Sequence, residues 1–278
     1  MIRLALEPRR PRSPAWICGT PRRAFTLIEL LVVIGLLALL MGLLLPALAK
    51  ARASANVTLC KSNLRQMVLA FNAYATDQHG FMPPNSVPLP LGQTDWWFGW
   101  TDNAFPLLNR ALDPTRGLLT AYFGNGMASA LQCPNFPYDD PNFVSEFSVH
   151  AANYGLNVYL SPYSYQNKVF KITRVLYPAQ TVVFADGMQM DGFPTGSFHE
   201  PFYLGIDMSP SGVPDLSPYG GFVHWRHQNT ANVAYLDGHV DAVNASDGYI
   251  VHPGVSGYPA GHLTSGYVGP NSPYGSPQ

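Results

Sequence analysis

The chain has 278 residues, of which 47% are hydrophobic and only 12% are charged. This composition is too apolar for a disordered chain, and 26 prolines with 25 glycines are too few for a low-complexity one. The formal net charge of −1 provides no basic field, so we expect no nucleic-acid partner.

Charge is divided unevenly between the first 24 residues and the rest. The head carries six arginines and one glutamate, which leaves 10 basic and 16 acidic residues for the other 254. A basic head before an apolar run is typical of a targeting signal.

The apolar run covers residues 25–49. As a helix these 25 residues would be about 37 Å long, which is enough to cross a bilayer. Cleavage after the A-x-A sequence at 47–49 would release a protein that begins at Lys50, but the run is longer than a usual signal-peptide core and contains a carboxylate. Cleavage before Phe25 would instead keep the helix on the mature protein.

Glu29 is the only ionisable residue in this run. A carboxylate in a membrane helix is costly and is by default a functional residue. One interpretation is that Glu29 pairs with the α-amino group of Phe25 on a neighbouring copy, a contact that a stack of parallel helices would repeat. The alternative is a first-turn glutamate that the helix dipole stabilises at the level of the lipid headgroups.

Residues 22–34, R-R-A-F-T-L-I-E-L-L-V-V-I, resemble the processing and methylation signal of type IV prepilins and type II secretion pseudopilins. The resemblance implies that a prepilin peptidase cuts between Ala24 and Phe25, that Phe25 is methylated, and that Glu29 is the assembly residue. Pro46 falls where proteins of this family often carry a helix-bending proline. The residue before the cut is usually glycine, so Ala24 departs from the pattern while keeping a small side chain.

The helix is predicted to continue beyond the membrane. Apolar residues recur every three or four positions from Val57 to Ala75, and Gly80 followed by two prolines ends the pattern. Residues 26 to about 78 therefore form one predicted helix, apolar all round in its first half and striped in its second. The stripe has to pack on the rest of the chain.

That remainder is predicted to be rich in strands and loops. The candidate strands are residues 143–149, 154–160, 169–175, 181–185, 221–225, 231–236 and 239–243. Asp237-Gly238 joins the last two, and Asp-Gly is a strong hairpin signal. Pairing across a two-residue turn would place on one face Ala231, Val233, Tyr235, Val240 and Ala242, as an antiparallel sheet covering the helix requires.

The predicted fold class is α+β and pilin-like, with a long N-terminal transmembrane helix whose extramembrane half packs on an antiparallel β-sheet. Five segments are expected: a basic leader (1–24), a membrane and assembly helix (25–49), an extramembrane amphipathic helix (50–80), a β-rich domain outside the cytoplasm (81–251) and a disordered Gly/Pro tail (252–278).

Two residue types leave alternatives open. Cys60 and Cys133 remain if the leader, which contains Cys18, is removed, and they form either a disulfide or two buried free thiols. The tryptophans at 96, 97 and 100 form either a buried aromatic cluster or an exposed platform for a sugar or a partner.

One constellation of acidic and histidine residues could ligate zinc or calcium, or form an acid–base pair. Its members are Asp186, Asp191, His224, His227, Asp237, His239 and Asp241. A strand between His227 and Asp237 would separate them by about 20 Å, and Asp-Gly has a sufficient role in the turn. We expect no enzyme and no cofactor, and keep calcium as the alternative, with Asp237, His239 and Asp241 as the candidate ligands.

A second resemblance joins two distant segments. His227, nine residues and then Asp237-Gly238 look like the H-x9-DG ending of a large group of pseudopilin-like bacterial proteins whose globular domain has no assigned role. Residues 60–66, C-K-S-N-L-R-Q, are similar to the segment that follows the membrane helix in that group.

The sequence thus predicts a structural subunit of a pseudopilus or type IV pilus-like filament. It would reside in the bacterial inner membrane as a single-pass protein with its C-terminal domain in the periplasm. The resemblance implies as partners prepilin peptidase, other pilin-like subunits, an inner-membrane assembly platform and the lipid bilayer. The alternatives are a membrane-anchored binding module, with the tryptophans contacting carbohydrate, and a secreted metal-binding hydrolase.

Overall fold

The structure is a computed structural model. It describes residues 26–102, 110–123, 130–157, 160, 171–175, 177–190, 198–201, 203–204, 221–244 and 265–266. The predicted leader 1–24, with Ala24, lies outside the described residues, as do Phe25 and Asp191. Of the predicted tail 252–278, only Ser265 and Gly266 are described.

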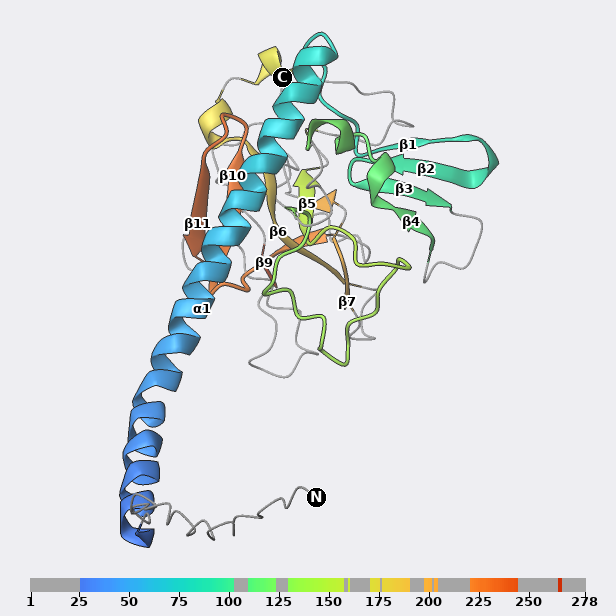
Figure 1. The fold of residues 1–278 in the computed structure, drawn as a ribbon. Helices are drawn as coiled ribbons and strands as arrows, with labels where there is room; N and C mark the ends of the chain where they lie inside the picture. The colour runs from blue at the N-terminus through green and yellow to red at the C-terminus, as the bar shows by residue number, and fades with distance from the viewer. Residues whose placement is uncertain are drawn as a thin grey trace, which may run out of the picture. The chain divides into compact units, whose positions relative to one another are not determined.

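The chain divides into two compact units, Met1–Lys50 and Ala51–Gln278. In the first unit, every described residue belongs to or directly precedes the helix α1 (Leu27–Asp77; Figure 1). Each of these residues is exposed. None of the apolar part of α1 is buried, and the helix is long and apolar enough to cross a membrane.

In the second unit, α1 buries one stripe of side chains. The buried members are Cys60, Asn63, Leu64, Met67, Val68, Ala70, Phe71 and Ala75, spaced by one to four positions as one face of a helix requires. The helix ends at Asp77, and the N–H of Gly80 donates to the carbonyl of Ala75 at 2.7 Å. His79 (φ 55°) and Gly80 (φ 90°) are left-handed, which is how the chain closes the helix end.

A small antiparallel meander follows the helix. It consists of β1 (Ser86–Pro88), β2 (Gln93–Trp96), β3 (Gly99–Asp102) and β4 (Leu112–Asp113), paired in that order. Short 3-10 turns lie beside these strands at Pro90–Gly92, Pro114–Arg116 and Thr120–Tyr122. The sequence predicted only a long connecting region here, because the strands are too short to show a period.

The larger sheet runs β11-β10-β6-β5-β8. Its strands are β5 (Tyr154–Asn157), β6 (Val182–Met190), β8 (Tyr203–Leu204), β10 (Thr230–Tyr235) and β11 (Val240–Asn244), with β7 (Phe198–His199) and β9 (Gly221–His224) paired to β6 and β12 (Ser265–Gly266) to β9. All pairs are antiparallel except β5 with β8. Two further 3-10 turns cover Ile172–Arg174 and Pro178–Gln180.

The helix stripe packs on this sheet, as predicted. Phe71 of α1 meets Phe184 of β6 edge to face, with the ring centroids 6.0 Å apart. The Nδ2 of Asn72 donates to the carbonyl of Leu236, beyond the end of β10, at 3.0 Å. One core cluster contains both the helix stripe and residues of β5, β6, β10 and β11, so the fold is α+β with one long helix on an antiparallel sheet.

Two predicted strands were wrong. Residues 143–149 form only isolated bridges, because the hydroxyl of Ser145 donates to the carbonyl of Phe147 and accepts from its N–H. Such a local side-chain bond competes with a strand ladder. In the segment 169–175, Ile172–Arg174 form a 3-10 turn, and the N–H of Ile172 donates to the carbonyl of Gly80.

The predicted hairpin exists, but its register differs by one residue. The N–H of Gly238 donates to the carbonyl of Tyr235, and the N–H of Tyr235 donates to the carbonyl of His239. The loop therefore has three residues rather than two, with Gly238 left-handed at φ 98°. A three-residue hairpin of this kind needs a left-handed residue at its last position, which glycine supplies.

The extra loop residue changes which side chains share a face. Ala234 lies opposite Val240, so Val240 joins the core beneath α1. Ala231 lies opposite Val243, and both belong to the cluster on the other face of the sheet. The prediction that placed Val240 with Ala231 was wrong by one position, and the face that carries Ala231, which was predicted to cover the helix, lies away from α1.

The tryptophans favour the buried interpretation. Trp97 is fully buried and Trp96 is 8% exposed, so neither forms a surface platform. Trp100 is half-buried, with the guanidinium of Arg116 4.5 Å from its ring centroid.

Candidate functional site

The first candidate site is the start of α1, where Thr26 and Glu29 bond to each other. Oε2 of Glu29 accepts from the N–H of Thr26 at 2.9 Å and from its hydroxyl at 3.0 Å. The N–H of Glu29 in turn donates to the hydroxyl oxygen of Thr26 at 3.2 Å. This reciprocal arrangement is a capping box, which satisfies N–H groups that have no partner within the helix.

Pro46 lies further along α1, inside the helix. It has no N–H to donate to the carbonyl of Gly42, so one intrahelical bond is missing. A bend at this position stays a prediction.

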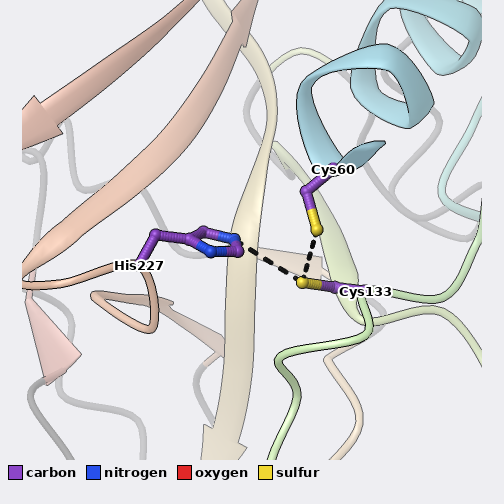
Figure 2. A group of neighbouring side chains, drawn as sticks. All are labelled: Cys60, Cys133 and His227. Carbon is purple, nitrogen blue, oxygen red and sulfur yellow. Dashed lines mark hydrogen bonds between the residues drawn. The ribbon is translucent and has the colours of Figure 1, made fainter. Parts of the chain in front are cut away.

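The second candidate site is a buried cluster formed by Cys60, Cys133 and His227 (Figure 2). The two Sγ atoms lie 2.7 Å apart, and Sγ of Cys133 lies 3.5 Å from Nε2 of His227. The exposed fraction is 0% for both cysteines and 2% for the histidine. Each comes from a different part of the chain: α1, the loop before β5, and the turn between β9 and β10.

Hydrogen bonds hold the backbone in place at two of these residues, Cys133 and His227. The N–H of Cys133 donates to Oδ1 of Asn153 at 2.8 Å. His227 and Thr230 exchange two backbone bonds across Gln228 and Asn229, whose φ angles are 55° and 65°. Two positive φ angles define the hairpin turn that matches strand twist, so the backbone of His227 is held rigidly.

Charged side chains surround the imidazole of His227. Oδ2 of Asp186 lies 3.3 Å from Nε2 of His227 and accepts from the N–H of Asn232 at 2.7 Å. Oδ1 of Asp186 lies 3.8 Å from Nε of Arg226. Arg226 also donates through one terminal nitrogen to the carbonyls of Asn153 and Gly187. A carboxylate with no exposed surface is thus shared by two basic side chains.

This environment separates the acidities of the three groups. Burial opposes ionisation of Cys133, but hydrogen bonds from Cys60 and His227 outweigh it and lower the pKa of that thiol to about 6. The bond to Cys133, together with burial, raises the pKa of Cys60. Burial lowers the pKa of His227, but bonds to Asp186 and Cys133 outweigh it and raise that pKa to about 9. The reduced cluster therefore favours a Cys133 thiolate beside an imidazolium.

The arrangement has a limited set of chemical capabilities. The sulfur and nitrogen atoms of Cys60, Cys133 and His227 lie within 4.8 Å of one another and are ligand types that zinc accepts. The same two sulfurs can oxidise to a disulfide. Nε2 of His227 faces both Cys133 and Asp186, so the carboxylate does not orient the imidazole from its far side as in a catalytic triad.

The structure splits the predicted acid–histidine constellation. It brings His227 to Asp186. Asp237 and His239 lie instead in the loop between β10 and β11, and Asp241 lies beside them in β11. Nδ1 of His239 contacts Oδ1 of Asp237, and Nε2 of His239 lies 3.8 Å from Oδ2 of Asp241. Slight burial raises the pKa of Asp237, but bonds from His239 outweigh it and lower that pKa.

Sequence reasoning missed several partners in the buried cluster. No pattern in the sequence indicates a role for Arg226, Asn153 or Asn135, although Arg226 directly precedes His227. The amide nitrogen of Asn135 lies 3.2 Å from Nδ1 of His227, and its amide oxygen accepts from Asn56 at 2.6 Å. Asn63, in the C-x-x-N-L segment, donates to the carbonyl of Gln132, next to Cys133, at 3.1 Å.

Comparison with known proteins identifies the amino-terminal region only. Residues 20–45 match the model of the prokaryotic N-terminal methylation motif. No curated protein and no solved structure matches the chain. The chain therefore carries a prepilin-type signal at the head of a membrane-length helix, the mark of a membrane-anchored type IV pilin-like or pseudopilin-type protein. Such a signal implies processing by a prepilin peptidase, and the match does not reach Cys60 or His227.

Proposed function

We propose that this protein is a structural subunit of a pseudopilus or type IV pilus-like filament, assembled through its N-terminal helix. The observation that carries the proposal is the methylation motif over residues 20–45, placed on a helix with an apolar first half that is wholly exposed in the single chain. Exposed apolar helices of this length have two partners available, lipid and other helices.

The geometry of Glu29 supports a contact between subunits. Among the described residues, both bonds from Thr26 use Oε2 of Glu29, and neither uses Oε1. Cleavage before Phe25 would create an amine directly before Thr26. We propose that Oε1 accepts a hydrogen bond from this amine on a neighbouring copy while Oε2 keeps the cap, so that one carboxylate makes both contacts.

Location and partners follow from the same proposal. The helix holds the protein in the bacterial inner membrane, the globular unit lies in the periplasm, and an assembly platform and other pilin-like subunits are the partners. We propose no catalytic role and no cofactor. Trp96 and Trp97 are buried, so they do not form the exposed platform that the carbohydrate-binding alternative needs. The secreted-hydrolase alternative requires a cut after Ala49, which would remove the matched motif.

Two substitutions at the helix start test the proposal. Glu29→Gln removes the negative charge but keeps the size, and Thr26→Val removes the cap but keeps the carboxylate. We expect both variants to insert and to be cleaved. Chemical cross-linking of membranes should give a ladder of multimers for the natural protein and for Thr26→Val, and monomers alone for Glu29→Gln.

The outcomes separate assembly from capping. An undiminished ladder for Glu29→Gln contradicts the intermolecular ion pair. Equal loss of the ladder in both variants would show that assembly needs the capped helix end as well as the charge of Glu29, which also contradicts the proposal.

A further inference from the structure

We infer that Cys60 and Cys133 form a disulfide in the mature protein, and that this bond fastens α1 to the globular unit at the point where the helix first becomes buried. The inference rests on the proposed function in one respect, since it places both cysteines outside the cytoplasm, where disulfides persist.

Proximity and burial single out this pair. The two sulfurs lie side by side although 73 positions separate the residues, and both are fully buried. Cys60 is held by α1, and Cys133 by the bond from its N–H to Asn153, so the contact joins two fixed backbones. Closing a loop of this length restricts the unfolded chain strongly, which is the main way in which a disulfide stabilises a fold.

The position of Cys60 on α1 gives the bond its purpose. No residue from 51 to 59 is buried, and Cys60 is the first buried residue of the helix. In a filament that holds the N-terminal half of α1, a force on the domain that follows α1 would separate the helix from that domain, starting at this end. A covalent bond at the first buried residue prevents this separation where it would begin.

The disulfide can form by thiol–disulfide exchange. The Cys133 thiolate attacks one sulfur of an external disulfide, whether a small molecule or a protein, and expels one thiolate, which leaves a mixed disulfide on Cys133. Cys60 loses its proton to the expelled thiolate and attacks the Cys133 sulfur, which releases the second thiolate. Two cysteine thiols are oxidised and one external disulfide is reduced to two thiols. The exchange takes place before α1 docks, because both sulfurs are inaccessible afterwards.

A zinc ion is the competing occupant of the cluster. The sulfurs and Nε2 of His227 are suitable ligands. The guanidinium of Arg226, close to Asp186, adds a positive charge beside the cluster and disfavours a dication. The sulfurs are also too close for two ligands of one zinc, whose bonds of about 2.3 Å require a wider spacing.

Peptide mapping of the full-length protein tests the inference. Membranes are solubilised in detergent with excess alkylating agent, and the protein is then denatured, digested without reductant and analysed by mass spectrometry. We expect a cross-linked pair of peptides that contain Cys60 and Cys133, lost on reduction. Alkylation of both cysteines after denaturation without reductant would overturn the inference, and so would zinc at one atom per chain in protein purified without added metal.

The double variant Cys60→Ser, Cys133→Ser provides the stability readout. Its melting temperature should lie roughly 5–15 °C below that of the natural protein. Reductant should lower the melting temperature of the natural protein to that of the variant only after a cycle of unfolding, because the bond is buried. Equal melting temperatures for the unreduced natural protein and the variant would contradict a fastening role.

The Glu29→Gln variant separates this inference from the proposed function. The disulfide lies within one chain, so the linked peptides should persist in Glu29→Gln although the multimers are lost. Free cysteines in a protein that still gives the ladder would overturn the disulfide alone. Linked peptides in a protein whose ladder is unchanged by Glu29→Gln would overturn the filament alone.

Discussion

The two halves of α1 belong to one helix but differ in how their side chains are exposed. In the first unit, Leu36 is 57% exposed and has neighbours of the same apolar kind on every side of the helix. In the second unit, Leu64 is fully buried and Leu69, little more than one turn later, is 64% exposed. The first half is apolar on every side, so its composition alone determines its surroundings. In the second half, burial of a residue depends on the side of the helix that it faces. The residues of the first half therefore suit contacts with lipid or with other copies of the chain. Those of the second half suit packing on the rest of the same chain.

The largest expected effect sharpens this contrast within α1. Phe71→Ala removes a fully buried ring that packs on Phe184, and we expect it to lower the free energy of unfolding by about 3–5 kcal/mol. Leu69→Ala on the exposed side should change it by less than about 0.5 kcal/mol. Denaturant unfolding in detergent, followed by near-UV circular dichroism, measures both. Equal effects would mean that the stripe does not pack as described.

Removing a buried charge in the second unit should lower the free energy of unfolding almost as much. Asp186→Asn leaves His227 and Arg226 without their shared carboxylate, so we expect a loss of about 3–5 kcal/mol in the free energy of unfolding. The matched control is Asp241→Asn, whose side chain is 69% exposed and which should be nearly neutral. The same denaturation experiment compares the two, and a neutral Asp186→Asn would contradict the buried ion cluster.

The pH dependence of stability should differ between the oxidised and reduced protein. With the disulfide formed, His227 loses the contribution of the Cys133 thiolate but still has Oδ2 of Asp186 3.3 Å from Nε2, so we expect its pKa to stay above the ordinary 6.5. The folded state then holds a proton that the unfolded state releases. This contribution is complete below pH 6.5 and is lost as the pH rises through the raised pKa, by at most about 1.4 kcal/mol per pH unit.

In the reduced protein, Cys133 offsets that loss. Its pKa falls from 9.0 to about 6, so between about pH 6.5 and 9 the folded state holds the proton on His227 and the unfolded state holds it on the cysteine. Both states bind the same number of protons, and we expect a flat profile. Denaturation midpoints across this range measure the difference, and parallel profiles for the two redox forms would contradict the coupling.

The smallest predicted effect concerns the loop between β10 and β11. Gly238 has a φ of 98° and open space around its missing side chain, so Gly238→Ala should cost about 1–2 kcal/mol through the backbone alone. Gly238→Asn should recover part of this cost, because asparagine tolerates left-handed conformations. A thermal melt of both variants checks the order, and equal stabilities would contradict a strained backbone at this position.

Features carried by neighbouring residues were predictable from the sequence. The helix, its stripe and its end at Gly80 depend on spacing within a few turns, and Asp237-Gly238 correctly marked a hairpin. The capping box of Thr26 and Glu29 was also readable as T-x-x-E, although the two interpretations of Glu29 were an intermolecular ion pair and a dipole effect. The loop length at Gly238 was not readable, because Asp-Gly suits two-residue and three-residue loops alike.

The buried cluster depended on contacts that no local pattern encodes. The sequence indicates Cys60, Asp186 and His227 separately as candidate residues, and it leaves open whether Cys60 and Cys133 form a disulfide. Their meeting requires α1, β6 and the β9–β10 turn to come together, which residue spacing cannot reveal. The same limit hid Arg226 and Asn153, whose roles exist only once the sheet has formed.

The first residue of the mature protein tests the central claim most directly. Protein extracted from membranes and analysed by amino-terminal sequencing and mass spectrometry should begin at Phe25 and carry one methyl group on its α-amine. A mature chain that begins at Lys50, or one that keeps its first 24 residues, would contradict a filament subunit assembled through this helix.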